Sequence, residues 1–353
     1  MVLSLLDRLF GGKISTTAMA FGLVAYQHGD RRGGARLVKI AAAAAPRDAA
    51  LQCQGAAAAA GAADHAVALQ LLERALRIRP DDRSLVVQAA LAQRALGDDR
   101  AAALRCEQAL ARIPVGDPGY ALMALAARLR MPGPGYLEHL AMIHGWLRPR
   151  AYVEIGVASG NSIGLAGPAT RAIGVDPAPE IGWPLPPNTT VFSQTSDDFF
   201  ATHDLRGLLG GLPVDLAFID GMHLFEFALR DFINLEKYCD PGATILFDDC
   251  CPFDRRSAER ERTTQFWTGD VWRIIPALRK YRPELHLRTI TTAPSGLCVL
   301  RGLDPGSRVL EDNFAAIVRE FIALDYAEFD SRRNEYLNPC PNEPERVRQI
   351  VLS

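Results

Sequence analysis

A period of 34 residues runs through the first third of the chain and limits the folds open to it. Proline, aspartate and small residues each recur at this spacing. The recurring sets are Pro46, Pro80 and Pro114; Asp30, Asp64 and Asp98; Ala41, Ala75 and Ala109; Gly34, Ala68 and Ala102; and Gly22, Ala56 and Ala90. Several registers that coincide at one period indicate a structural repeat. A unit of this length holds two helices joined by a turn, so we expect stacked helix pairs over residues 13–116.

Each residue type in the repeat has a physical role in a helix pair. The small residues would lie where two helices approach closely. Aspartate would cap the second helix by accepting hydrogen bonds from its free backbone N–H groups, and proline would end that helix. The segment resembles tetratricopeptide repeats, although alanine replaces most of that family's aromatic positions. Two roles stay open: a groove or interface that binds a protein partner or a second copy of the chain, or a solenoid that only supports the rest of the molecule.

A proline- and glycine-rich segment at residues 131–135 marks the end of the helical region. We therefore place a helical repeat domain at residues 1–135, an α/β domain at 136–303, and a C-terminal helical extension with a tail at 304–353. In the extension, one helix is expected from Asp312 to about Tyr326. Three prolines then break further structure before a short final helix.

Composition and patterning exclude several classes of protein. A net charge of −2 and a pI of about 6.4 give no overall field that would collect nucleic acid or an anionic membrane. No apolar run reaches 18 residues, so no membrane span is expected. Seven cysteines without a framework predict a reducing, cytoplasmic compartment. Residues 2–10 are apolar but include Asp7 and Arg8, which argues against a signal peptide; we expect a packing helix there, with an amphipathic docking helix as the alternative.

Short apolar runs alternate with helical patterns from about residue 149 onward. Seven strands are expected at 151–157, 172–176, 190–194, 214–220, 243–248, 285–291 and 297–300, with the clearest helices at 225–238 and 270–281. This alternation predicts a mostly parallel sheet with helices on both faces. Because ligands bind such sheets at the carboxyl ends of the strands, the residues after each strand form the candidate site.

The first two strands end in residues suited to a nucleotide. Gly156 and Gly160 follow strand one and permit a sharp turn that a ligand can approach closely. A helix is expected to begin near Asn161 and to aim its N–H groups at the same place. Asp176, at the end of strand two, is placed to accept hydrogen bonds from ribose hydroxyls, with an ordinary loop aspartate as the alternative. The fingerprint G-x-G-x-x-G is absent, which counts against NAD or FAD.

With Glu154 opening E-x-G-x-x-x-G, and with Ser196-Asp197 after strand three, the α/β region resembles class I S-adenosylmethionine-dependent methyltransferases. The resemblance covers roughly residues 136–303 and implies a Rossmann-like, seven-stranded sheet. The segment around Ser196 either caps the next helix or faces an adenine. The residues that the resemblance assigns to S-adenosylmethionine are Glu154, Gly156, Gly160, Asp176, Ser196, Asp197 and Asp220.

Acidic residues follow strands four and five, whose ends are neighbours in a parallel sheet. Asp220 ends strand four, and Asp248 and Asp249 end strand five. Three carboxylates at one place repel one another unless a cation neutralises them. Oxygen ligands suit Mg²⁺ or Mn²⁺, so we expect a divalent metal on these three residues. His223 lies three residues after Asp220 and reaches the same cleft. The plain alternatives are solvated turn acids, a histidine held by neighbours, and an Asp220 that contacts only the cofactor.

The spacing of these four residues resembles metal-dependent O-methyltransferases, above all the macrolide-sugar O-methyltransferases and the cephalosporin hydroxylase group. That resemblance implies His223 as general base, Asp220 as a second catalytic residue, and a hydroxyl of a sugar, glycan or polyol-type small molecule as methyl acceptor. Met222 and Leu224 depart from the polar residues usual there. Two other functions stay open: a non-catalytic tetratricopeptide scaffold that binds the cofactor, and a hydroxylase-like relative.

The segment between strand five and the helix at 270–281 carries alternating arginine and glutamate. Such a run is typical of a solvated, mobile segment, and a lid over the cleft is the alternative for residues 252–268. Asp270 is expected to cap the helix that follows it.

Overall fold

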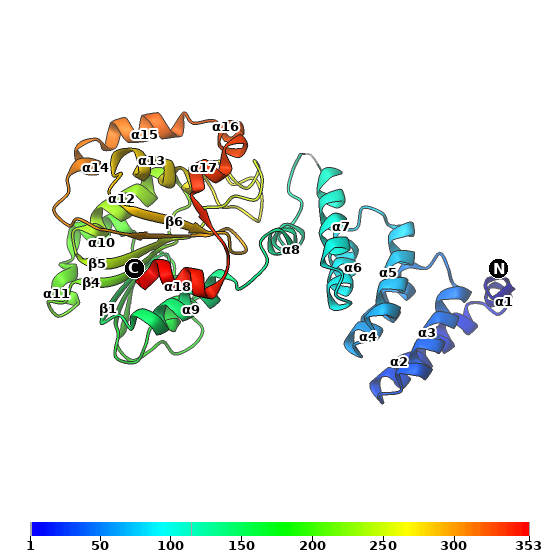
Figure 1. Ribbon diagram of the computed structural model, residues 1–353. Helices are drawn as coiled ribbons and strands as arrows, with labels where there is room; N and C mark the ends of the chain where they lie inside the picture. The colour runs from blue at the N-terminus through cyan, green and yellow to red at the C-terminus, as the bar shows by residue number, and fades with distance from the viewer. Residues whose placement is uncertain (1, 114, 353) are drawn as a thin grey trace. The chain divides into compact units, whose positions relative to one another are not determined.

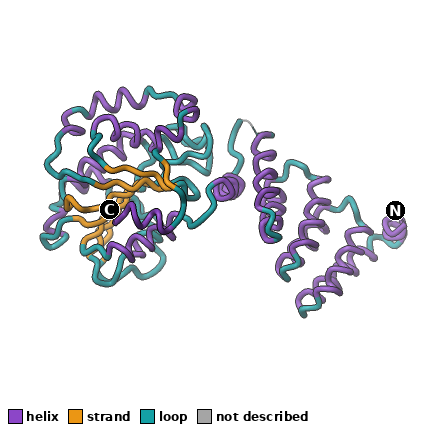
Figure 2. Tube along the Cα trace, in the orientation of Figure 1, coloured by secondary structure: helices purple, strands orange, loops and turns teal. Residues whose placement is uncertain are grey.

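The computed structural model describes residues 2–113 and 115–352, so Pro114 of the repeat lies outside the described residues. The chain forms two compact units, Met1–Arg130 and Met131–Ser353. Described strands occur in the second unit, whereas the first is helical (Figures 1 and 2). No helix within the described ranges is long and apolar enough to cross a bilayer.

The first unit contains three helix pairs, as the 34-residue period predicted. A short helix, α1 (Val2–Leu9), precedes them, and α8 (Tyr120–Arg130) packs on the last pair. The pairs are α2 (Lys13–Gln27) with α3 (Arg31–Ala44), α4 (Ala49–Gly61) with α5 (His65–Ile78), and α6 (Arg83–Ala95) with α7 (Asp99–Ala111). The predicted helical repeat is therefore confirmed.

Aspartate caps the helices of the repeat. Asp30, Asp64 and Asp98 accept hydrogen bonds from the backbone N–H three residues later, at 2.8, 3.3 and 2.9 Å, and so cap α3, α5 and α7 as predicted. A second set, missed in the sequence, caps the first helix of a pair: Asp48 caps α4 and Asp82 caps α6, at 3.0 and 3.2 Å. Most helix starts in the repeat are thus fixed by a carboxylate that satisfies a free N–H group.

Small residues lie where the helices of a pair meet. A Cβ added to Gly34 would lie 2.7 Å from the ring of Tyr26, and one added to Gly22 would lie 2.8 Å from Val38. The alanines that replace these glycines in the later repeats are buried: Ala56, Ala68, Ala90 and Ala102. Close helix packing therefore recurs in each pair, and small residues at these positions permit it.

Asp64 links two repeats, because it also accepts a hydrogen bond from the Tyr26 hydroxyl at 3.1 Å. Replacing Asp64 with alanine is expected to lower the free energy of unfolding by about 1–2 kcal/mol through the loss of the cap and of this bond. Urea denaturation followed by far-ultraviolet circular dichroism measures the change. Asp81→Ala, an exposed neighbour of a cap, is the control and should cost less than about 0.5 kcal/mol. Equal losses in the two variants would refute the capping role.

The second unit is built on one sheet with the strand order β3-β2-β1-β4-β5-β7-β6-β8. Neighbouring strands pair in parallel, except that β7 runs antiparallel to β5 and β6. The strands are β1 (Ala151–Ile155), β2 (Arg171–Val175), β3 (Thr189–Phe192), β4 (Val214–Ile219), β5 (Cys239–Phe247), β6 (His286–Ile290), β7 (Leu297–Arg301) and β8 (Pro339–Cys340). All seven predicted strands are present, so the predicted Rossmann-like sheet is confirmed. The two-residue β8 was not predicted.

Helices cover both faces of this sheet (Figure 1). Successive strand residues point to opposite faces: Tyr152 and Phe218 face α9 and α18, whereas Val153 and Ile219 face the cluster that includes α12 and α13. The helices are α9 (Tyr136–Leu147), α10 (Ser196–Thr202), α11 (Leu205–Leu208), α12 (Phe225–Glu236), α13 (Ile274–Tyr281), α14 (Val309–Asp312), α15 (Phe314–Ile322), α16 (Tyr326–Ser331), α17 (Arg333–Leu337) and α18 (Pro344–Leu352).

Two helix predictions in this unit are wrong. The helix expected near Asn161 is only a 3₁₀ turn, η1 (Ile163–Leu165), which Gly167-Pro168 follows. Proline at that point cannot continue a helix, because it lacks the N–H group and clashes with the preceding turn. The single helix expected from Asp312 to Tyr326 is broken as well: α15 ends at Ile322, and Asp325 begins α16 by accepting a hydrogen bond from the Ala327 N–H at 2.7 Å.

Candidate active site

The turn after β1 lies directly against the end of β4. Gly156 has a φ of 86°, and a Cβ at this position would lie 1.8 Å from the carbonyl oxygen of Asp220. In the same place the Asp220 N–H donates to the carbonyl oxygen of Ile155 at 2.8 Å. Only glycine allows both the positive φ and this approach. The turn that sequence analysis assigned to a cofactor therefore lies in direct contact with the acid that ends β4.

Gly156→Ala is expected to lower the free energy of unfolding by at least about 2 kcal/mol, because the methyl group forces the turn away from β4 and the positive φ strains an L-residue. Gly182→Ala is a matched control: a Cβ there meets no atom within 4 Å. Guanidinium denaturation of both variants tests the expectation. A Gly156 variant as stable as the Gly182 variant would contradict the close approach.

Asp176 holds the glycine-rich turn from β2. One oxygen of its carboxylate accepts hydrogen bonds from the backbone N–H groups of Val157 and Ala158, at 2.9 and 2.8 Å, and the other accepts from Ala178 at 2.7 Å. Gly160, with a φ of 80°, ends the same turn. The contact of Asp176 with a ribose stays a prediction. What the structure adds is that this carboxylate shapes the turn.

Glu154 lies inside the fold, beneath the turn. It is fully buried and accepts hydrogen bonds from the hydroxyls of Tyr152, at 2.5 Å, and Ser162, at 2.7 Å. Burial raises the pKa of Glu154 to about 8, against the effect of these two hydrogen bonds. Its bonds run to β1 and to the segment before η1, so Glu154 fixes the turn from within.

The pKa of Glu154 predicts a pH dependence of stability. Because the folded-state pKa of about 8 lies above the ordinary value of 4.5, its stabilising contribution is fully present below about pH 4.5 and is lost as the pH rises through about 8. Relative to Glu154→Gln, which does not titrate, the wild-type free energy of unfolding should fall by a few kcal/mol over this window, at about 1.4 kcal/mol per pKa unit. Denaturation curves at pH 5 to 9 measure it. Parallel pH profiles of the two proteins would refute it.

Ser196 and Asp197, the predicted cofactor residues after strand three, form side-chain contacts with residues of α12. Thr195, not Ser196, caps α10 by accepting a hydrogen bond from the Asp198 N–H at 3.1 Å. Ser196 is hydrogen-bonded to the buried carboxyl of Asp231, whose pKa is raised to about 7 by burial. Asp197 accepts a hydrogen bond from Arg230 at 2.7 Å. The segment does cap its helix, and its contact with an adenine stays a prediction.

The ends of β4 and β5 bring Asp220, His223 and Asp249 together. The imidazole Nδ1 lies 2.9 Å from a carboxylate oxygen of Asp249, and Nε2 lies 3.4 Å from Asp220. One ligand atom of each residue lies within 4.8 Å of the other two. Asp248 is adjacent and buried, and its carboxylate accepts hydrogen bonds from the Asp249 N–H at 2.8 Å and from the Ser295 hydroxyl at 3.2 Å.

Charge is concentrated at this cluster, and the pKa values respond to it. Burial, with the nearby Asp249, raises the pKa of Asp220 to about 6, although His223 opposes the shift. Burial, with Asp220 and Asp249, raises the pKa of Asp248 well above its usual range. Burial alone would lower the pKa of His223, but the two carboxylates outweigh it, and the pKa lies well above 6.5. Burial and the neighbouring carboxylates therefore favour the protonated forms of Asp220 and Asp248, and the carboxylates favour a protonated His223.

These donors fit a divalent cation. Two carboxylates and an imidazole nitrogen converge, a third carboxylate lies beside them, and burial together with repulsion between the acids raises the pKa values of Asp220 and Asp248. A cation would relieve this repulsion, and carboxylate oxygens are the ligands that Mg²⁺ and Mn²⁺ favour. Of the three predicted metal ligands, Asp220 and Asp249 have atoms in the converging set. Asp248 is outside this set, and one of its carboxylate oxygens accepts both of the hydrogen bonds described above.

His223 is fixed by the segment before η2 (Val271–Arg273), which sequence analysis did not connect with the site. The indole of Trp267 stacks on the imidazole at 5.3 Å between ring centroids. The backbone carbonyl oxygen of Trp267 lies 3.2 Å from Nδ1 of His223. The Asp270 N–H donates to the His223 carbonyl oxygen at 3.2 Å. Gly269, with a φ of 57°, lies so near that carbonyl that a Cβ would overlap it, at 1.7 Å. Residues 267–270 thus hold both the ring and the backbone of His223.

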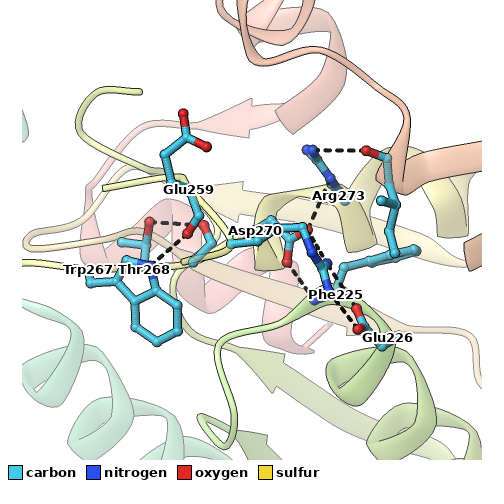
Figure 3. A network of polar contacts seen from close by, with 10 residues as sticks. Phe225, Glu226, Glu259, Trp267, Thr268, Asp270 and Arg273 are labelled. Atoms are coloured by element: carbon cyan, nitrogen blue, oxygen red, sulfur yellow. Dashed lines mark hydrogen bonds and ion pairs between the residues drawn. The ribbon is translucent and has the colours of Figure 1, made fainter. Parts of the chain in front are cut away.

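Asp270 joins this segment to α12 (Figure 3). Its fully buried carboxylate accepts a hydrogen bond from the Phe225 N–H at 2.8 Å and forms ion pairs with Arg260 at 2.6 Å and Arg273 at 3.2 Å. Arg260 also forms an ion pair with Glu226 at 2.6 Å. The prediction that Asp270 caps the helix after it is wrong: it makes no side-chain bond there and caps α12 instead.

The segment at 252–268 is folded on itself, and its side chains Phe253, Ala258 and Phe266 are buried. Ser257 and Thr268 are buried, and the Thr268 hydroxyl donates to the Ser257 carbonyl oxygen at 2.9 Å. The Trp267 indole N–H donates to the Glu259 carbonyl oxygen at 2.7 Å (Figure 3). Arg260 ties the charged run to other parts of the domain, because its partners Glu226 and Asp270 both lie outside residues 252–268. The solvated interpretation of this run is therefore wrong for Arg260, and the lid stays a prediction.

Residues 153–250 match a family described as a methyltransferase domain. This part of the chain is therefore a methyltransferase domain, and the predicted enzyme class is confirmed. The match spans the glycine-rich turn, Asp176, Asp220, His223 and the acid pair after β5. A search of curated proteins found no match to the chain.

Solved structures similar to the chain share low sequence identity with it. The O-methyltransferase TomG from Streptomyces achromogenes, involved in tomaymycin synthesis and in complex with S-adenosylmethionine, is 16% identical over 47% of this chain and 78% of its own, with a TM-score of 0.35. The O-methyltransferase from Bacillus cereus in complex with S-adenosylhomocysteine is 16% identical over 56% and 89%, with a TM-score of 0.35. The Arabidopsis OM64 TPR domain is 20% identical over 33% and 95%, with a TM-score of 0.27.

Proposed function

We propose that the second unit is an S-adenosylmethionine-dependent O-methyltransferase that acts on a hydroxyl of a sugar, glycan or polyol-type small molecule. The observation that carries the proposal is the convergence of Asp220, His223 and Asp249 beside the Gly156 turn. Asp220 and Asp249, with Asp248 beside them, would hold Mg²⁺ or Mn²⁺. The turn from Gly156 to Gly160 and the carboxylate of Asp176 would receive the cofactor.

In this proposal His223 takes the proton of the acceptor hydroxyl. Its Nδ1–H donates towards Asp249 and the Trp267 carbonyl, which fixes the ring and leaves Nε2 as the atom that receives a proton. The stacked indole shields one face of the imidazole from water. A histidine between two carboxylates is protonated and is a poor base, so the acids must be neutralised before Nε2 can act.

The two bound groups supply the rest of the chemistry. S-adenosylmethionine would supply the electrophilic methyl group, and the divalent cation would lower the pKa of the acceptor hydroxyl while neutralising Asp220 and Asp249. The chain itself contributes position: the turn after β1 and the end of β4 touch, so the cofactor and the acceptor are held next to each other.

Calorimetric titration of the full chain with S-adenosylmethionine, with and without Mg²⁺, tests the proposal. We expect binding in both conditions, followed by release of S-adenosylhomocysteine when glycans and polyols are supplied with Mg²⁺. Asp312→Asn, an exposed acid far along the sequence from the site, is the control and should bind equally. No cofactor heat in any condition would overturn the proposal. Transfer to an amine and to no hydroxyl would overturn the acceptor class.

A further inference from the structure

Helix α1 is amphipathic but carries its apolar face outward. Val2, Leu5, Leu6 and Leu9 follow the spacing of one helix face, and Val2, Leu5 and Leu9 are 72%, 58% and 72% exposed. The helix's one acidic residue, Asp7, is instead 6% exposed. A helix that only supports its neighbours would bury its apolar face and expose Asp7. The reverse arrangement in α1 indicates that a binding partner covers the apolar face.

Hydrogen bonds fix α1 in this orientation. The Asp7 carboxylate accepts hydrogen bonds from the Ser15 N–H and the Ser15 hydroxyl, both at 2.8 Å, at the first turn of α2. Helix α1 also packs against α3 (Figure 1). To turn the apolar face inward, the chain would have to break both bonds to Asp7. The exposed leucines are therefore a feature that the fold maintains.

The same part of the chain is basic. Residues 1–39 contain six Lys and Arg against two Asp, a net charge of +4, whereas the remainder carries −6. Asp7 is buried, and Asp30, which caps α3, is the one exposed acidic side chain among described residues 2–39. The basic residues are Arg8, Lys13, Arg31, Arg32, Arg36 and Lys39, and all are exposed. Arg32, Arg36 and Lys39 follow one line along α3, and the ion pairs among the described residues include none of the six.

We propose that α1 and the basic line of α3 form a docking surface for an anionic lipid bilayer. The apolar face of α1 enters the boundary between headgroups and acyl chains, and the arginines and Lys39 pair with headgroup phosphates. A second copy of the chain fits less well, because a two-fold pairing of this surface brings two regions of like charge together. The inference concerns the first unit and does not depend on the proposed function.

Cosedimentation of the full chain with vesicles tests the surface. The vesicles are phosphatidylcholine alone and phosphatidylcholine with phosphatidylserine. We expect binding to the anionic vesicles only, with an affinity at least about tenfold lower in L5E/L9E, because burial of the two side chains is lost. R32Q/R36Q/K39Q should bind about 100-fold more weakly. The control is L104E on α7, where the leucine is 53% exposed and distant in the repeat, and it should bind like wild type.

Circular dichroism melting of each variant shows that it is folded, and light scattering gives the mass. Binding that survives L5E/L9E, or that is equal on neutral and anionic vesicles, overturns the proposal. So does a wild-type dimer that L5E/L9E converts to a monomer while neither protein binds vesicles. Loss of binding in the leucine and the arginine variants, with L104E unchanged and all variants folded, supports it.

Discussion

His223→Gln is expected to lower the rate constant of methyl transfer by about 10²- to 10⁴-fold, the range for removal of a positioned general base. The glutamine keeps the size of the side chain but cannot take a proton at the position of Nε2. S-adenosylmethionine affinity should stay within a few-fold of wild type, because the turn at Gly156 is held by Asp176 and by the end of β4. Single-turnover measurements with a hydroxyl acceptor separate the chemical step from binding.

Comparison with Asp249→Asn distinguishes a role of His223 as general base from a role as metal ligand. Asp249→Asn should abolish Mn²⁺ binding, measured by calorimetry or electron paramagnetic resonance, because replacing the carboxylate with an amide removes one negative charge from the converging set. His223→Gln should retain Mn²⁺ binding. If His223→Gln loses Mn²⁺ as fully as Asp249→Asn does, His223 is a ligand and its role as base is wrong. If neither variant changes Mn²⁺ binding, the metal site is wrong.

The repeat was predictable because its chemistry is local. A capping aspartate acts on an N–H group three residues away, so its position in the sequence carries its function, and a 34-residue spacing makes it visible. Asp48 and Asp82 cap helices in the same way, yet they form only two copies at this period because position 116 is glycine. Two copies do not stand out in a chain with many aspartates. The structure was needed to find them.

The cluster at β4 and β5 was predictable for a topological reason. Strand ends that are adjacent in a parallel sheet bring Asp220 and Asp249 together whatever the intervening sequence does. The support of His223 was not predictable, because it comes from Trp267 and Gly269, more than forty residues later. No pattern near His223 encodes such a contact.

Asp270 shows how a local pattern misleads. An aspartate just before a helix is usually its cap, and sequence analysis assigned it so. The chain brings the N-terminus of α12 and two arginines to the same carboxylate, and these partners offer an N–H group and two positive charges. Tertiary contacts therefore outweighed the local preference. The short η1 in place of a full helix has a local cause, Gly167-Pro168, that the sequence did contain.

Asp270→Ala is expected to lower the free energy of unfolding of the second unit by about 3–5 kcal/mol. The substitution leaves Arg273, whose side chain is 10% exposed, without the carboxylate that compensates its buried charge. It also removes one partner of Arg260 and the acceptor of the Phe225 N–H. Guanidinium denaturation followed by tryptophan fluorescence reports the change, since Trp267 and Trp272 flank Asp270 in the sequence.

Two variants make the result specific. Asp312→Ala removes an exposed ion pair with Arg308 in the same unit and should cost less than about 1 kcal/mol. Asp270→Asn retains an acceptor for the Phe225 N–H but no charge, so it should recover part of the loss and leave the cost of an Arg273 without its carboxylate, while Arg260 keeps Glu226. A cost near that of Asp312→Ala would mean that Arg260 and Arg273 find other partners. A large cost would show that the Asp270 carboxylate, together with the Arg260–Glu226 ion pair, joins the charged segment at 252–268 to α12. The backbone N–H of the same residue holds the backbone of His223.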